Sequence, residues 1–220
     1  MSFQAMTQFF TQGGIWMFPI LAAQIFSIAL IIERTMFLYF GKAPSAKRRV
    51  RQFEEDIKKG QLDRVVNRAG RSGEIVALMA RTGAESVMHS SGKEEIQLKM
   101  EELVMEETAR FERRLGFLPM IANVATLLGL LGTIVGLIQS FGSIATATGA
   151  DKARLLSEGV SVAMNTTAYG LIVAVPALVA FALLQNRANV LSEDLQKAAL
   201  RLYIWFGFNV EKPVKSSRGA

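Results

Sequence analysis

Three long apolar segments without a charged residue constrain the fold of this chain of 220 residues. They run from Ile15 to Ile32, from Leu115 to Ala150 and from Gly159 to Asn186. About 20 apolar residues in a helix cross the hydrocarbon core of a bilayer, where the backbone must satisfy its own hydrogen bonds. The sequence therefore predicts an all-α integral membrane protein with transmembrane helices at about residues 15–38, 117–142 and 160–185.

The distribution of Lys and Arg predicts the orientation. There are none in residues 1–14, 16 in residues 41–114 and six from Arg187 onward. Because cytoplasmic flanks carry an excess of Lys and Arg, we expect the N-terminus outside and the C-terminus inside. The segments between the spans are then a periplasmic N-terminus at 1–14, a cytoplasmic helical domain at 41–114, a short periplasmic connection at 143–159, and a cytoplasmic helix extension and tail at 186–220.

The net charge of +6 follows largely from this topology, so it does not favour a nucleic-acid partner. The basic residues just past the first span instead suit contacts with membrane lipids, whose phosphates attract such clusters.

The regions outside the spans have a helical pattern. Short helices are expected at residues 46–59, 62–69 and 74–88. The amphipathic stripe that starts at Lys93 contains no Gly before Gly116, which predicts one continuous helix from about Glu94 to about Phe141. The third span also continues as a helix beyond the membrane.

Each of the last two spans carries a face of small and hydroxyl residues, at spacings of three and four that place each set on one side of its helix. In the second span the face comprises Ala122, Thr126, Gly129, Thr133, Gly136 and Ser140, and in the third Ala163, Thr167, Gly170, Ala174 and Ala177. Because lipid favours large apolar side chains, such a face must meet protein or water.

Helix packing and an ion path both explain these faces. The residues that predict close packing are Gly129, Gly132, Gly136, Gly170 and Pro176, and they include a small-xxx-small motif. The candidate ion-path residues are Thr126, Thr133, Thr166, Thr167, Ser140, Ser161 and Asn165. Threonine also bonds its own helix backbone, so a single hydroxyl does not decide between the two.

The spans contain no titratable residue at depth, and the edge carboxylates are Glu33 and Glu158. A proton path normally needs a titratable group in mid-membrane. A proton channel built from this chain therefore needs an acid from another polypeptide. The sequence also lacks a phosphate-binding loop, a metal-ligand cluster and a nucleophile–base set, so we expect no enzyme activity, no metal and no cofactor.

Three motifs occur in order along the chain. Pro19-Ile-Leu shares the first span with Glu33-Arg34, ANVATLLGLLGTIVG occupies residues 122–136, and TTAYGLIVAVP occupies residues 166–176. Together they resemble the span signatures of the MotA/TolQ/ExbB proton-channel family. Three spans resemble its TolQ/ExbB branch more than its flagellar branch.

The resemblance implies a multi-pass, stator-type motor subunit in the bacterial inner membrane. In the family, five copies surround a dimer of an ExbD/TolR-like single-span partner, whose transmembrane Asp carries the proton. The motor couples the proton-motive force to work at the cell envelope, and a TonB/TolA-like effector is a further expected partner. Thr133 and Thr167 match pore-lining threonines of the family.

The sequence also departs from the family pattern, and two alternatives stay open. Val162 stands where some ExbB-type members have Glu, and Glu158, one turn further out, is the nearest carboxylate. Because hydroxyls coordinate Na⁺ as well, a sodium-driven version of the same motor is one alternative. The other is a non-conducting membrane scaffold, in which the striped faces are dry packing surfaces.

Overall fold

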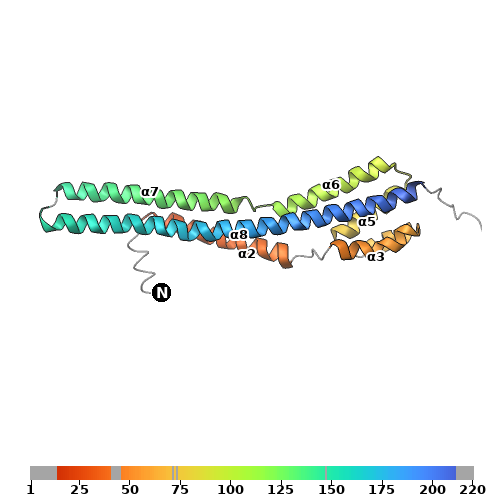
Figure 1. The fold of residues 1–220 in the computed structure, drawn as a ribbon, viewed down its shortest axis with the longest axis horizontal. Helices are drawn as coiled ribbons and strands as arrows, with labels where there is room; N and C mark the ends of the chain where they lie inside the picture. The colour runs from red at the N-terminus through yellow and green to blue at the C-terminus, as the bar shows by residue number, and fades with distance from the viewer. Residues whose placement is uncertain (1–13, 41–45, 71, 73, 147, 212–220) are drawn as a thin grey trace, which may run out of the picture. The chain divides into compact units, whose positions relative to one another are not determined.

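The structure, a computed structural model, describes residues 14–40, 46–70, 72, 74–146 and 148–211. Most of the predicted N-terminal segment and most of the predicted tail lie outside the described residues. The described residues form helices and no strand (Figure 1). In chain order the helices are α2 (Met17–Thr35), the π-helix η1 (Met36–Phe40), α3 (Ala46–Lys58), α4 (Leu62–Ala69), α5 (Ile75–Met88), α6 (Lys93–Glu112), α7 (Phe117–Thr146) and α8 (Ala150–Glu211).

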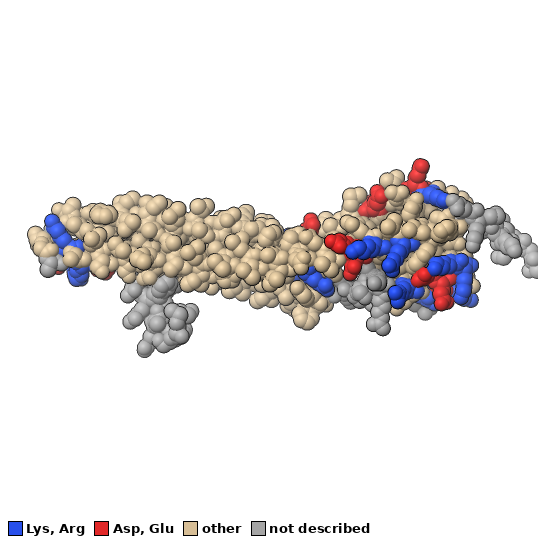
Figure 2. Space-filling model, in the orientation of Figure 1, with Lys and Arg blue, Asp and Glu red and all other residues tan. Residues whose placement is uncertain are grey.

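Three helical stretches are long and apolar enough to cross a membrane, namely Met17–Phe40, Lys93–Ala145 and Asp151–Asn209. This confirms the predicted all-α fold class, whereas the orientation stays a prediction. Internal contacts divide the chain into a membrane unit, residues 14–35 and 114–184, and a second unit, residues 36–113 and 185–211. Charged side chains gather over the second unit, and the surface over α7 is almost free of them (Figure 2).

The core of the membrane unit joins its three helices through small and medium side chains. Ile20 of α2, Ala125 of α7 and Val173 of α8 form one buried cluster. Three buried alanines of α7 and α8 form another, namely Ala122, Ala174 and Ala177. Such residues let helix backbones approach closely, which is the main source of helix association in lipid.

The predicted continuous helix from Glu94 to Phe141 is wrong, because a turn at residues 113–116 separates α6 from α7. Arg114 in this turn has a φ of +65°. A residue with a Cβ seldom adopts this left-handed conformation, because Cβ then lies too close to the following carbonyl oxygen. A helix cannot run through such a residue.

Pro119 explains why α7 restarts where it does. In a continuous helix the proline ring would clash with the carbonyl oxygen of Leu115, and proline has no N–H to donate to it. That oxygen instead accepts a hydrogen bond from the N–H of Leu118 at 3.1 Å. Pro119 thus lies in the first turn of α7, where proline is tolerated.

Helix α3 ends where the sequence predicts, in a Schellman motif. Gly60 has a φ of +72°. Its N–H donates to the Ile57 carbonyl at 3.0 Å, and the Gln61 N–H donates to the Asp56 carbonyl at 2.9 Å. The carboxamide of Asn209 in α8 donates to the same Ile57 oxygen at 2.7 Å. Glycine provides the left-handed residue of this motif without strain.

Helix α5 ends in the same motif, but with serine in the left-handed position. Ser90 has a φ of +59°. Its N–H donates to the Val87 carbonyl at 3.1 Å, and the Ser91 N–H donates to the Ser86 carbonyl at 2.9 Å. The motif therefore satisfies the terminal carbonyls of α5 while straining the backbone of Ser90.

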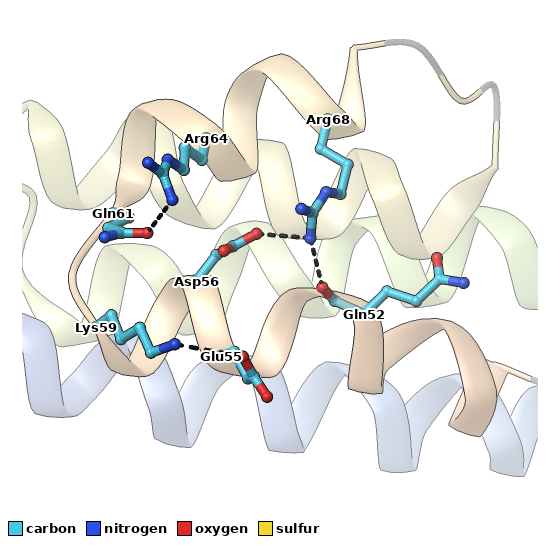
Figure 3. Close-up of polar contacts among 7 residues, drawn as sticks. All are labelled: Gln52, Glu55, Asp56, Lys59, Gln61, Arg64 and Arg68. Atoms are coloured by element: carbon cyan, nitrogen blue, oxygen red, sulfur yellow. Dashed lines mark hydrogen bonds and ion pairs between the residues drawn. The ribbon is translucent and has the colours of Figure 1, made fainter.

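An ion pair between an exposed arginine and a nearly buried aspartate joins α3 to α4 in the second unit (Figure 3). Arg68 lies 2.6 Å from the carboxylate of Asp56, whose side chain is only 12% exposed. Arg68 also donates to the Gln52 carbonyl at 2.9 Å. By contrast, the neighbouring pair of Lys59 and Glu55 is largely exposed, so it contributes little to stability.

Candidate functional site

Helices α7 and α8 approach each other through opposed glycines. A Cβ added to Gly170 would lie 2.7 Å from the carbonyl oxygen of Ala125. One added to Gly129 would lie 3.1 Å from the carbonyl oxygen of Thr166. Because these neighbours are backbone atoms that cannot rotate away, the two predicted packing glycines lie at the point of closest approach.

Two of the predicted hydroxyls are enclosed in this helix contact. Thr166 is fully buried, and a Cβ added to Gly132 would lie 2.8 Å from its Cβ. Its hydroxyl donates to the Val162 carbonyl at 2.9 Å. Ser140 is buried against Gly159 and donates to a carbonyl of its own helix. Within one chain these two hydroxyls are covered by the neighbouring helix rather than presented at the surface.

Thr133 of α7 and Thr167 of α8 form a hydrogen-bonded pair across the same contact. Their hydroxyl oxygens bond to each other. Each hydroxyl also lies within hydrogen-bonding distance of the Gly129 carbonyl, at 3.1 Å in both cases. The Thr133 hydroxyl reaches the Ala163 carbonyl of α8 at 3.3 Å. Both side chains are half-buried, so they are held in place but not enclosed.

The threonine pair lies on the side of the α7–α8 contact that faces away from α2. Helix α2 packs against the contact at Ala125 and Val173. Going around α7 from that point, the residues of the contact follow in the order Ala125, Gly129 and Thr133. Going around α8, they follow in the order Val173, Gly170 and Thr167. Each step turns about 40° on α7 and about 60° on α8, away from α2 in both cases. We call this side the open flank.

Thr126 belongs to the open flank as well. It lies seven residues before Thr133, which places the two on nearly the same line along α7. Its side chain is exposed, and its hydroxyl donates to the Ala122 carbonyl at 3.0 Å. The open flank therefore carries hydroxyls at two depths of the predicted second span.

Three other predicted residues of α8 do not reach the threonine pair. Successive residues of a helix are turned by about 100°, so Glu158, Ser161 and Asn165 all lie between about 120° and 180° around α8 from Thr167. Glu158 and Ser161 are exposed, and Asn165 is half-buried. They form a separate polar line on α8 rather than an extension of the open flank.

Glu33 lies at the other end of the membrane unit, away from the hydroxyls. Its carboxylate accepts hydrogen bonds from Arg34 at 3.1 Å and from Arg114 at 2.6 Å. Arg34 is buried, and the side chains of Glu33 and Arg114 are each 44% exposed. The carboxylate thus joins the end of α2 to the turn before α7.

Pro176 is exposed, and α8 continues through it as a helix.

One polar contact inside the membrane unit was not predicted from the sequence. The hydroxyl of Tyr169 in α8 donates to the carboxamide oxygen of Gln24 in α2. Tyr169 also packs on the cluster that joins the three helices. The signal was present, because Gln24 is the one carboxamide in the first apolar segment. This bond fixes α2 on the side opposite the open flank.

The site is rich in hydroxyls and holds no acid of its own. No group of His, Cys, Asp and Glu that could bind a metal ion occurs among the described residues. The open flank therefore offers threonine oxygens and helix carbonyls. These groups form hydrogen bonds or coordinate a cation, but they do not titrate near neutral pH.

Known proteins and one family model are similar to this chain. A family model described as the MotA/TolQ/ExbB proton channel family matches residues 71–197. Biopolymer transport protein exbB1 of Vibrio cholerae is 37% identical over 46% of this chain, and the match spans 45% of that protein's length. Putative biopolymer transport protein ExbB-like 1 of Synechocystis sp. is 31% identical over 80% of this chain and 68% of that protein.

A solved structure shares the fold. The structure of C. jejuni MotAB has a TM-score of 0.60 at 16% sequence identity, and the similarity covers 87% of this chain and 75% of that chain. The family model covers more than half of the chain, and the Synechocystis relative is similar over most of its own length. The chain therefore belongs to the MotA/TolQ/ExbB proton channel family.

Proposed function

We propose that this chain is the proton-conducting, stator-type subunit of a motor in the bacterial inner membrane. Five copies would surround a dimer of a single-span partner whose transmembrane Asp carries the proton. The observation that supports this most is the pair of Thr133 and Thr167 on the open flank, in a segment without any acid. Because the chain belongs to a family of channel proteins, it is a transport protein and not an enzyme.

The open flank suits contact with a second polypeptide. The hydroxyl of Thr126 is exposed on α7 among apolar residues such as Leu127 and Leu130. Exposed hydroxyls in a span are expected to meet protein or water rather than lipid. A closed ring of copies would turn every open flank toward one central cavity, where the partner helices would lie.

In this arrangement the threonine pair holds the partner's carboxyl group in mid-membrane. Thr133 and Thr167 are fixed by the Gly129 and Ala163 carbonyls, so their oxygens keep one position as the partner helix moves past. One charge that crosses 100 mV releases about 2.3 kcal/mol, which is the energy available per proton. By the positive-inside rule the end of α7 near Arg114 faces the cytoplasm.

Proton uptake by a reconstituted complex tests the proposal. The chain is co-expressed with its single-span partner, the purified complex is placed in vesicles, and uptake driven by a pH gradient is recorded. Thr167→Val keeps the shape of the side chain but removes the hydroxyl, and Thr167→Ser is the matched control that keeps it. We expect uptake to require the partner, to fall about tenfold or more in Thr167→Val, and to survive in Thr167→Ser.

The same assay separates the alternatives. Uptake in Thr167→Val at the wild-type rate would rule out the role assigned to this hydroxyl. An assembled wild-type complex that transports sodium down a sodium gradient but no protons would identify a sodium-driven motor. One that transports neither ion would identify a membrane scaffold, in which α7 and α8 only pack.

A further inference from the structure

Asn123 is a polar residue of α7 to which no role has been assigned. It is exposed, and it lies three residues before Thr126 and ten before Thr133. At about 100° per residue all three side chains fall within about 80° around the helix. Asn123 therefore lies at the edge of the open flank, about 80° around α7 from Thr133 in the direction away from α8, and one turn nearer to Arg114 than Thr126.

The Asn123 amide has no hydrogen-bond partner within the described part of the chain. Exposed apolar side chains flank it along α7, with Met120 53% exposed and Leu127 64% exposed. An amide in hydrocarbon without a hydrogen-bond partner is strongly disfavoured. Since this helix crosses the membrane, the amide must meet water or another polypeptide.

The depth of Asn123 in the membrane indicates whether its amide meets water or another polypeptide. Thr133 lies about 24 Å along the axis from Phe117, the first residue of α7, at 1.5 Å per residue. Asn123 lies about 15 Å from Thr133 and about 9 Å from that end. It thus lies between the threonine pair and the end of α7 near Arg114. An ion that leaves the pair toward Arg114 must cross this stretch.

We propose that Asn123 holds the water into which the ion is released on the Arg114 side of the membrane. This inference rests on the proposed channel function and extends its path beyond the threonine pair. The hydroxyl of Thr126 already donates to the Ala122 carbonyl, so it offers a water only an acceptor. The Asn123 amide has both donors and an acceptor available, so it can orient a water that Thr126 also binds.

Ion flux through the reconstituted complex is the first test. Asn123→Leu removes the amide at similar volume, Asn123→Ser keeps a polar group, and Val124→Leu is a control for altered bulk at the neighbouring exposed position. We expect Asn123→Leu to lower flux about tenfold, and the other two variants to keep most of it. A decrease of less than threefold in an assembled Asn123→Leu complex overturns the proposal.

Cysteine accessibility is the second test, and it holds even if Asn123→Leu fails to assemble. The chain contains no cysteine, so Asn123→Cys introduces a single thiol whose labelling is read by mass. The thiolate, which forms only in contact with water, attacks a water-soluble thiol reagent and bonds to it. Ile25→Cys is the control, because Ile25 is 62% exposed on α2, on the other side of the unit from the open flank.

We expect the thiol at position 123 to react in the complex with its partner and the thiol at position 25 to stay unreacted. Equal protection at the two positions overturns the proposal and indicates a dry contact with the partner or with lipid. A wild-type complex that passes no ions overturns the channel function itself. In that case labelling at position 123 still reports whether water reaches this amide.

Discussion

The carboxylate of Glu33 and the guanidinium of Arg114 lie 2.6 Å apart, although 81 positions separate them in the sequence. This ion pair ties the end of α2 to the turn that interrupts α6 and α7. Arg114 is the left-handed residue of that turn, so the residue that makes the pair also bears the backbone strain.

Two substitutions of Arg114 separate these contributions. Arg114→Ala and Arg114→Gly both remove the ion pair, whose half-exposed side chains contribute only about 0.2–1 kcal/mol. Only glycine relieves the left-handed strain, which costs about 1–2 kcal/mol for other residues. We expect the glycine variant to melt at the higher apparent temperature. The reverse order would show that the left-handed backbone of this turn carries no strain that glycine relieves.

Ser90→Gly is expected to stabilise the second unit. The Schellman motif after α5 requires a φ of +59° at this position, and glycine adopts it at no steric cost. The gain should be about 1 kcal/mol, visible as a higher apparent melting temperature of the purified protein. Ser91→Gly, at the next position, has no such strain to relieve and should not raise stability. A gain in both variants would point to a cause other than the backbone.

Gly170→Ala should separate α7 from α8. Its Cβ would lie 2.7 Å from the Ala125 carbonyl, so the helix backbones must move apart and the Thr133–Thr167 hydrogen bond must lengthen. Overpacking of this kind costs about 1–3 kcal/mol. The expected result is a lower apparent melting temperature together with reduced ion flux. Gly142→Ala is the matched control in α7, because nothing lies within 4 Å of its added Cβ.

Arg68→Met should destabilise the second unit more than Lys59→Met. The first substitution leaves the nearly buried carboxylate of Asp56 without its cation, and an unpaired buried charged group costs at least about 1–3 kcal/mol. The second removes a partner of Glu55, whose side chain is 80% exposed, and should cost less than about 1 kcal/mol. Urea unfolding of both variants measures the difference. Equal effects would mean that solvent screens the Asp56 pair as fully as the surface pair.

The helix ends that were predicted correctly are those with a local cause. Helix α3 ends before Gly60, whose left-handed φ completes the Schellman motif, and α4 ends at Ala69, just before Gly70. The turn between α6 and α7 has a partly distant cause. Nothing in the Arg113-Arg114 dipeptide disfavours a helix, and the pairing of Arg114 with Glu33 becomes visible only once the chain is folded.

The same distinction applies to the candidate site. Small residues at spacings of three and four located the α7–α8 contact, since helix periodicity alone puts them on one face. Periodicity does not tell which part of that face stays accessible beside a third helix. The placement of α2 through Ile20 and Tyr169 decides that Thr133 lies on the open flank and that Asn165 does not.

The hydrogen bonds of the threonine pair determine which chemical groups the pair can bind. Every hydroxyl hydrogen of Thr133 and Thr167 has an acceptor inside the chain, either a helix carbonyl or the other threonine. A group that binds here therefore meets only the lone pairs of the two threonine oxygens, which are acceptors. A carboxylic acid that bears its proton can donate to them, whereas an ionised carboxylate meets only further acceptors. The pair would thus discriminate between the two charge states of one carboxyl side chain. It would bind a carboxyl group from another polypeptide only while that group is protonated.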